Sequence, residues 1–347
     1  MKPSHLVTAL KSLITAGQPT FVWGPPGVGK SQVVKQVADE LFGPKEANTR
    51  PRINNKRVEK TASHFIDLRL PLLDAVDLRG IPTIADGKTM WIPPSFLPRD
   101  GKGVLFFDEL VQAPTIVQNA ASSIILPPHT LGEYTLPSGF AMVAAGNRET
   151  DRAGTQRMPS HIANRFTHLH YEVHLEDWVT WAFQHDIEPA VIAFLNFRPE
   201  LLHKFDPTVK AYPTPRSWEF ISRIMKQGIA DECFLEVISG TVGEAAATEF
   251  VGFFRVFRSL PDYEDIIKNP NVTTVPDNAA ALYATCGMLT ARGESKHAKA
   301  LFTYVGRLPM DFQVLVYRDI TKNNLDMSET QGYINFTVAN QKIILNK

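Results

Sequence analysis

Residues 24–31 decide the fold of this chain: Gly24-Pro25-Pro26-Gly27-Val28-Gly29-Lys30-Ser31 matches the pattern G-x-x-x-x-G-K-[S/T] at every fixed position. The apolar run at 21–23 predicts a buried strand before this loop, and apolar residues at helical spacing over 31–41 predict a helix after it. In this context backbone N–H groups turn toward a phosphate, and the helix N-terminus adds positive partial charge. We therefore expect a nucleotide site, in which Lys30 reaches the β- and γ-phosphates and Ser31 ligates Mg²⁺.

An acidic pair follows the second informative run, Val104-Leu105-Phe106-Phe107. A wholly apolar run of this kind is typical of a central strand that is covered on both faces. The carboxyl ends of parallel strands lie on the same side of the sheet as the phosphate loop, so Asp108 is expected to hold Mg²⁺ and Glu109 to polarise the attacking water. A strand that merely ends in two acids is the plainer alternative.

A third apolar strand, predicted at 140–145, ends in Gly146-Asn147-Arg148. The amide of Asn147 is placed to orient the attacking water or to contact the γ-phosphate. Alternatively, Asn147 is a turn residue that tolerates the left-handed conformation.

A short helix at 158–166, with Arg165 at its end, leads into a strand predicted at 167–174. This strand carries His168, His170 and His174 at alternate positions, on one face. Satisfied or exposed histidines are commoner in such a strand than metal ligands, and no cysteine lies nearby in the sequence.

Two hairpins and a helical region complete the pattern. Asp86-Gly87 between apolar runs predicts a tight hairpin over 81–92, and Gly132-Glu133 predicts a second one over 129–136. Beyond residue 175 the periodicity is helical. Thr214 and Pro215 there read as the N-cap and first residue of a helix, from whose N-terminal end Arg216 projects.

Composition limits the function classes. The 347 residues carry 36 basic and 36 acidic side chains and are 44% hydrophobic, which indicates a globular chain without a global field toward nucleic acid or anionic membrane. Cys233 and Cys286 form no C-x-x-C pair, and no apolar run approaches the roughly 20 residues that span a bilayer. The N-terminus shows no apolar signal core, so we expect a cytoplasmic protein without a membrane segment.

These motifs, in this order, resemble those of the AAA+ ATPases, and within them the MoxR-like branch. Residues 24–31 look like Walker A, 104–109 like Walker B, Asn147 like sensor 1, Arg165 in Ala-Asn-Arg-Phe like the arginine finger, and Arg216 in Thr-Pro-Arg-Ser like sensor 2. The hairpins are similar to the helix-2 insert and the pre-sensor hairpin of that family. The resemblance covers about the first two-thirds of the chain and rests on the order of the motifs.

The resemblance implies an α/β fold: a P-loop NTPase parallel sheet flanked by helices with β-hairpin inserts, then an all-helical lid and a helical C-terminal region. The domains expected are 1–174, 175–260 and 261–347. It also implies a hexameric ring with ATP and Mg²⁺ between subunits, which remodels or activates a client protein, often with a von Willebrand A-domain partner. The loop itself reads phosphates, so the choice between ATP and GTP stays open at this point.

Two other functions remain open from the residues. A nucleic-acid motor or loader would draw on the basic run at 50–60, although a solvated loop is the simpler interpretation of that run because no aromatic residues alternate with its charges. A nucleotide-gated assembly scaffold would bind ATP with little hydrolysis. Glu109 argues against the scaffold, and the neutral charge argues against the motor.

Overall fold

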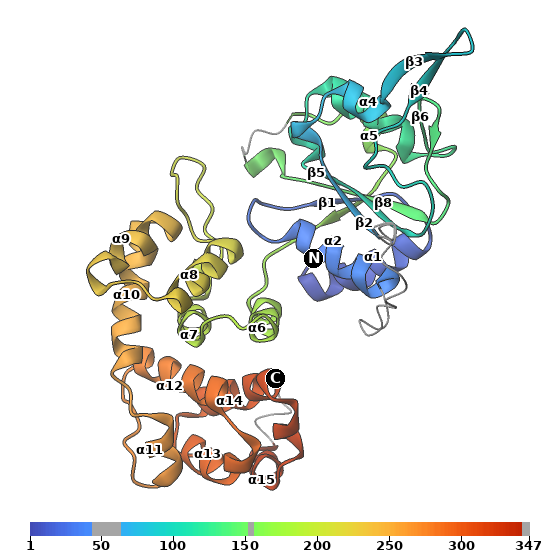
Figure 1. Ribbon diagram of the computed structural model, residues 1–347. Coiled ribbons are helices and arrows are strands. Elements are labelled where there is room, and N and C mark those ends of the chain that lie inside the picture. The colour runs from blue at the N-terminus through green and yellow to red at the C-terminus, as the bar shows by residue number, and fades with distance from the viewer. Residues whose placement is uncertain (44–63, 152–155, 342–347) are drawn as a thin grey trace, which may run out of the picture. The chain divides into compact units, whose positions relative to one another are not determined.

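The computed structural model describes residues 1–43, 64–151 and 156–341, so the basic run predicted at 50–60 lies outside the described residues. The chain forms two compact units, Met1–Glu172 and Val173–Lys347, and each is described by itself (Figure 1).

The first unit alternates strands and helices. Its elements in chain order are α1 (Pro3–Thr15), β1 (Thr20–Trp23), α2 (Lys30–Phe42), β2 (Phe65–Arg69), α3 (Ala75–Arg79), β3 (Ile81–Ala85), β4 (Lys88–Ile92), β5 (Gly103–Asp108), α4 (Thr115–Ile125), β6 (Thr130–Leu131), β7 (Tyr134–Thr135), β8 (Phe140–Gly146), α5 (Ser160–Ala163) and β9 (Thr167–His170).

Among the described residues, five strands form one sheet in the order β2-β5-β8-β1-β9, and every neighbouring pair is parallel. The central strands β5 and β8 are buried along their whole length, as expected where both faces of a parallel sheet are covered. Helices α1 and α2 pack on one face and α4 on the other (Figure 1). This arrangement confirms the predicted P-loop NTPase fold class, and it sets β1, which leads into the phosphate loop, beside β8.

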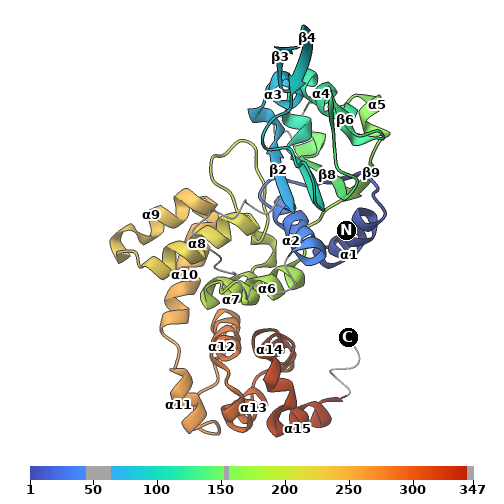
Figure 2. The same cartoon turned by 45° about the vertical axis from the view of Figure 1, so that its right-hand side comes forward.

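Two hairpins are inserted in this unit, as predicted. Strands β3 and β4 pair antiparallel, and the turn residues Asp86 and Gly87 both have positive φ (50° and 71°), which is the two-residue turn that matches strand twist. The β3–β4 hairpin extends away from the five-stranded sheet in both views (Figures 1 and 2). The shorter β6–β7 hairpin turns at Gly132, whose φ is 58°.

The predicted strand at 167–174 is too long. Strand β9 ends at His170, which pairs with Trp23, the last residue of β1. The backbone N–H of Tyr171 still donates to the carbonyl of Trp23 at 2.7 Å, and after Trp23 the chain turns into the phosphate loop, so the strand stops. His174 instead caps α6, where its Nδ1 accepts a hydrogen bond from the backbone N–H of Asp177 at 3.4 Å. The prediction of three histidines on one strand face is therefore wrong.

The second unit is helical. Its helices are α6 (Leu175–Gln184), α7 (Pro189–Phe197), α8 (Pro215–Gln227), α9 (Asp231–Val242), α10 (Glu244–Arg258), α11 (Tyr263–Lys268), α12 (Ala279–Arg292), α13 (Ala298–Val305), α14 (Met310–Asn323) and α15 (Gln331–Ala339). None of the helices formed by the described residues of either unit is long and apolar enough to cross a membrane.

Helix α12 joins two hydrophobic clusters of this unit, one centred on α6–α10 and one on α11–α15. It packs against α7 so closely that a Cβ at Gly287 would lie 2.5 Å from the Cβ of Ala193, so glycine is needed there. The predicted boundary between residues 260 and 261 falls near the junction of the two clusters, and a division into separate domains stays a prediction.

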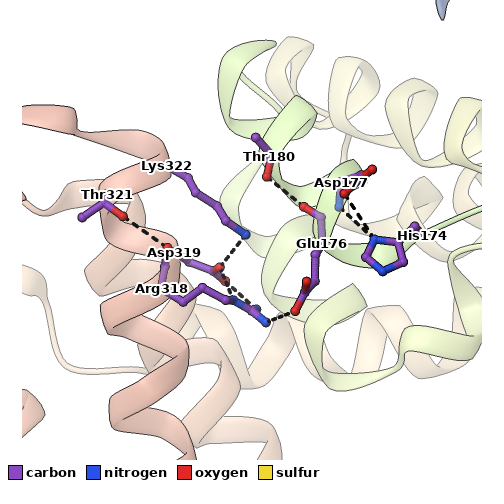
Figure 3. Close-up of polar contacts among 8 residues, drawn as sticks. All are labelled: His174, Glu176, Asp177, Thr180, Arg318, Asp319, Thr321 and Lys322. Carbon is purple, nitrogen blue, oxygen red and sulfur yellow. Dashed lines mark hydrogen bonds and ion pairs between the residues drawn. The ribbon is translucent and has the colours of Figure 1, made fainter. Parts of the chain in front are cut away.

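An ion-pair network also joins the two ends of the second unit (Figure 3). Arg318 on α14 contacts Glu176 on α6 at 2.9 Å and the buried carboxylate of Asp319 at 2.8 Å. Lys322 contacts the same carboxylate at 3.2 Å. Asp319 is only 2% exposed, so these two cations stabilise a charge that would be costly to bury alone.

Candidate nucleotide-binding site

The phosphate loop is held at the carboxyl ends of β1 and β8. The backbone N–H of Gly24 donates to the carbonyl of Gly146 at 3.2 Å, which ties the start of the loop to the end of β8. Gly29 precedes α2 with φ of 90°, a conformation that strains any residue with a Cβ. Because α2 begins at the next residue, the orphan N–H groups of its first turn lie at the loop.

Lys30 is surrounded by oxygen atoms. Its Nζ donates to the carbonyls of Gly24 (2.8 Å) and Pro25 (2.9 Å) and to Oδ1 of Asn147 (2.9 Å). Asn147 is itself buried, directly after β8. Two residues that the sequence predicted for the same phosphate are therefore in contact, although 117 positions separate them. An ammonium held in this way can exchange loop carbonyls for phosphate oxygens.

Ser31 and Asp108 are also in contact. The Ser31 hydroxyl donates to Oδ2 of Asp108 at 2.7 Å, and the Asp108 side chain is mostly buried at 9% exposure. The other carboxylate oxygen, Oδ1, accepts the backbone N–H of Glu109 at 3.0 Å. A hydroxyl and a carboxylate that converge at a phosphate loop are hard oxygen ligands of the kind that Mg²⁺ prefers. These two residues thus fit the ion.

Glu109 has a strained backbone. Its φ is 58° and its ψ is 33°, which is the left-handed region that residues other than glycine seldom adopt. The strand β5 ends one residue earlier, so the chain turns sharply here and the Glu109 side chain is exposed while Asp108 is buried. The geometry can thus separate a metal-facing carboxylate from one that is open to water.

Asp67 is a further carboxylate at this edge, which the sequence analysis missed. It lies on β2, two residues before Arg69, which is in register with Asp108. Desolvation and the nearby charge of Asp108 raise the pKa of Asp67; Arg69 opposes this shift, and Glu109 adds a smaller increase. Residues 64–70 alternate in a way that predicts a strand, and this pattern could have pointed to Asp67, because the carboxyl end of that strand meets the same edge of the sheet.

Neither of the two predicted arginines takes part in the contacts described above. Arg165 follows α5, and its guanidinium donates to the backbone carbonyl of Ser122 in the last turn of α4. That carbonyl has no partner within its own helix, so the arginine acts as a C-terminal cap. Arg216 is exposed in the first turn of α8, after the capping box of Thr214 and Ser217, and belongs to the second unit. The roles of both arginines toward a nucleotide stay predictions.

No protein-family model matches the chain, and no curated protein matches it significantly. Solved structures that match include NtrX from Brucella abortus in complex with ATP, with 12% identity, 98% of this chain and 67% of that chain covered, and a TM-score of 0.42. A RuvB mutant from Thermotoga maritima matches with 17% identity, coverage of 76% and 73%, and a TM-score of 0.39. A DNA polymerase III gamma subunit-related protein from Thermotoga maritima matches with 12% identity, coverage of 98% and 92%, and a TM-score of 0.33.

Because these identities and scores are low, the fold assignment rests on the strand order, the register and the loop geometry of the chain itself. On that basis the first unit has a P-loop NTPase fold.

Proposed function

We propose that this chain is an ATP-hydrolysing, ring-forming protein of MoxR-like AAA+ type that uses ATP to remodel or activate a partner protein. The observation that carries the proposal is the pair of contacts Lys30–Asn147 and Ser31–Asp108 at one end of the parallel sheet. They bring together a phosphate-binding cation, an amide and two oxygen ligands, and this is the set of groups that phosphoryl transfer requires.

The residues divide the work as follows. Lys30 and the N–H groups at the start of α2 hold the phosphates, and Asn147 orients Lys30 and the γ-phosphate. Glu109, whose carboxylate is exposed beside Asp108, takes a proton from the attacking water. Ser31 and Asp108 would hold Mg²⁺, which when bound neutralises charge on the β- and γ-phosphate oxygens.

Two variants test the site. Lys30→Ala should lose ATP binding, whereas Glu109→Gln should bind ATP and fail to hydrolyse it, because only the second group acts solely on the water. Fluorescent-nucleotide titration and a phosphate-release assay measure the two properties. Hydrolysis by Glu109→Gln at the parent rate would refute the assignment.

For Arg165 we propose a role in the nucleotide site of a neighbouring subunit. A guanidinium has five N–H donors, so the contact with the Ser122 carbonyl leaves others for a phosphate. Arginine at such a place neutralises charge that develops in phosphoryl transfer. For Arg216 we propose a contact with the nucleotide from the helical unit, supported by its exposure in the first turn of α8.

The β3–β4 hairpin is the proposed contact with the partner protein. Ile81 and Ile92 pair across the two strands and are 69% and 55% exposed, and Ile84 is 81% exposed. The hairpin projects from its unit (Figure 2), and apolar side chains exposed on such an element are costly in water unless they serve a contact. Trp91 is only partly exposed, so it packs in part against its own surroundings.

Trapping of a bound client by an ATP-bound, hydrolysis-deficient variant tests the proposed contact with a partner protein. Glu109→Gln in the presence of ATP should retain its client, and the client, with any von Willebrand A-domain protein, is identified by mass spectrometry. The matched control replaces residues 86–88 by Gly-Ser-Gly in the same Glu109→Gln background. The control should keep ATP binding and lose the client, and equal recovery from both baits would contradict a role for the hairpin.

A further inference from the structure

The side chain of His168 bridges two segments that the proposed mechanism uses. Its Nδ1 lies 2.9 Å from the indole Nε1 of Trp23, and its Nε2 lies 2.9 Å from the backbone carbonyl of Ala163. An indole N–H only donates, so Nδ1 must accept the hydrogen bond from Trp23. Nε2 must therefore carry the hydrogen atom, and it donates a hydrogen bond to the carbonyl of Ala163. One neutral tautomer of His168 therefore satisfies both contacts.

One end of this bridge is the phosphate loop. Trp23 is the last residue of β1, and the next residue, Gly24, both opens the loop and provides a carbonyl acceptor for Lys30. The rings of Trp23 and His168 are also stacked, with centroids 6.0 Å apart and 26° between their planes. The position of the imidazole is thus set by β1.

The other end is the segment that carries Arg165. Ala163 is the last residue of α5, a helix of four residues, and Arg165 follows two positions later. So short a helix has little stability of its own and depends on tertiary contacts. The imidazole donates to the carbonyl of Ala163, which also accepts the backbone N–H of Phe166 at 3.2 Å, and the ring of Phe166 packs edge-on against Phe21 of β1 at 5.6 Å.

We propose that His168 is a positioning residue, which holds the Arg165 segment in a fixed place relative to the phosphate-loop strand. The inference rests on the proposed function, in which Arg165 acts on a nucleotide. Catalysis depends on placement to within about 1 Å, so a loosened segment would lower turnover without weakening ATP binding in the same subunit. The sequence marked His168 only as a strand histidine, and the contact with Trp23 spans 145 positions.

Two substitutions separate hydrogen bonding from packing. His168→Phe keeps an aromatic ring beside Trp23 and loses both hydrogen bonds, whereas His168→Gln keeps one acceptor and one donor. We expect His168→Phe to lower kcat about tenfold with an unchanged KM for ATP, and His168→Gln to recover most of the loss. Melting temperatures measured in parallel identify any general loss of folding.

A double-mutant cycle with Arg165→Ala closes the test. If His168 acts through Arg165, adding His168→Phe to Arg165→Ala should cause no further loss of kcat. An equal loss in both backgrounds, or a folded His168→Phe protein with the kcat of the parent, would overturn the role of His168 alone. A parent protein that binds ATP but never turns it over would overturn the proposed function, and this inference with it.

Discussion

We predict that the strained backbone of Glu109 lowers the stability of the protein, while its carboxylate supports ATP hydrolysis. A residue other than glycine in the left-handed region costs about 1–2 kcal/mol, and Glu109 has φ of 58° there with an exposed side chain. Glu109→Gly removes that cost but adds about 0.5–1 kcal/mol of backbone entropy lost on folding. The variant should therefore be more stable than the parent by about 0.5–1 kcal/mol, and it should lose roughly 10²- to 10⁴-fold in turnover if the carboxylate is the base.

Two controls isolate the backbone effect. Glu109→Gln keeps the side-chain length and the strain, so its stability should match the parent while its turnover is lost. Glu236→Gly places the same substitution at an exposed position inside α9, where it should cost about 1 kcal/mol. The two glycine variants should thus shift stability in opposite directions.

Urea unfolding followed by hydrogen exchange measures the free energy of unfolding of each unit separately. Peptides from β5 report the first unit and peptides from α9 the second, and a shift of midpoint at constant slope gives the change in free energy of unfolding. Phosphate release gives turnover. A Glu109→Gly protein that is less stable than the parent, or that hydrolyses ATP at the parent rate, would contradict the prediction.

Three further predictions concern other charges. The folded state raises the pKa of Asp67, so the parent loses stability as pH rises from the ordinary value of 3.8 through the raised one. Asp67→Asn should therefore be more stable than the parent at neutral pH, by less than about 1 kcal/mol, and equal to it below that window, as thermal melts across pH will show. Arg165→Ala and Lys30→Ala should each be nearly inactive, yet mixing them should restore hydrolysis; subunit exchange, shown by labelling, without recovered activity would rule out the role in trans. Asp319→Ala leaves two cations without their buried partner and should cost about 2–3 kcal/mol in urea unfolding, whereas Glu176→Gln should cost less than 1 kcal/mol because that pair is exposed; similar costs would contradict this difference.

Local sequence determined the features whose causes lie within a few residues. The glycines of the phosphate loop, the Asp86-Gly87 turn and the Thr214 cap each specify a backbone conformation directly, and the structure has all of them. The apolar runs likewise marked β5 and β8, because a strand buried on both faces needs apolar side chains at every position. These signals were sufficient for the fold class.

Weak or short local patterns were not enough elsewhere. Helix α11 has six residues and α9 contains Gly240, and the local sequence pattern predicted neither helix. Such helices are stabilised mainly by packing, here of Tyr263 and Ile266 in one and Ile238 and Val242 in the other, so periodicity alone carries little information about them.

Only the tertiary structure added the partners that no motif marked. The strand order places β5 and β8 between β2 and β1, which gives the predicted meeting of Asp108 and Ser31 across 77 positions its physical basis and brings the unpredicted Asp67 to the edge of the same site. It also turns His168 from an unremarkable strand residue into the partner of Trp23. The reason is physical: strand pairing is selected by the free energy of packing the whole core, to which each local pattern contributes only a part.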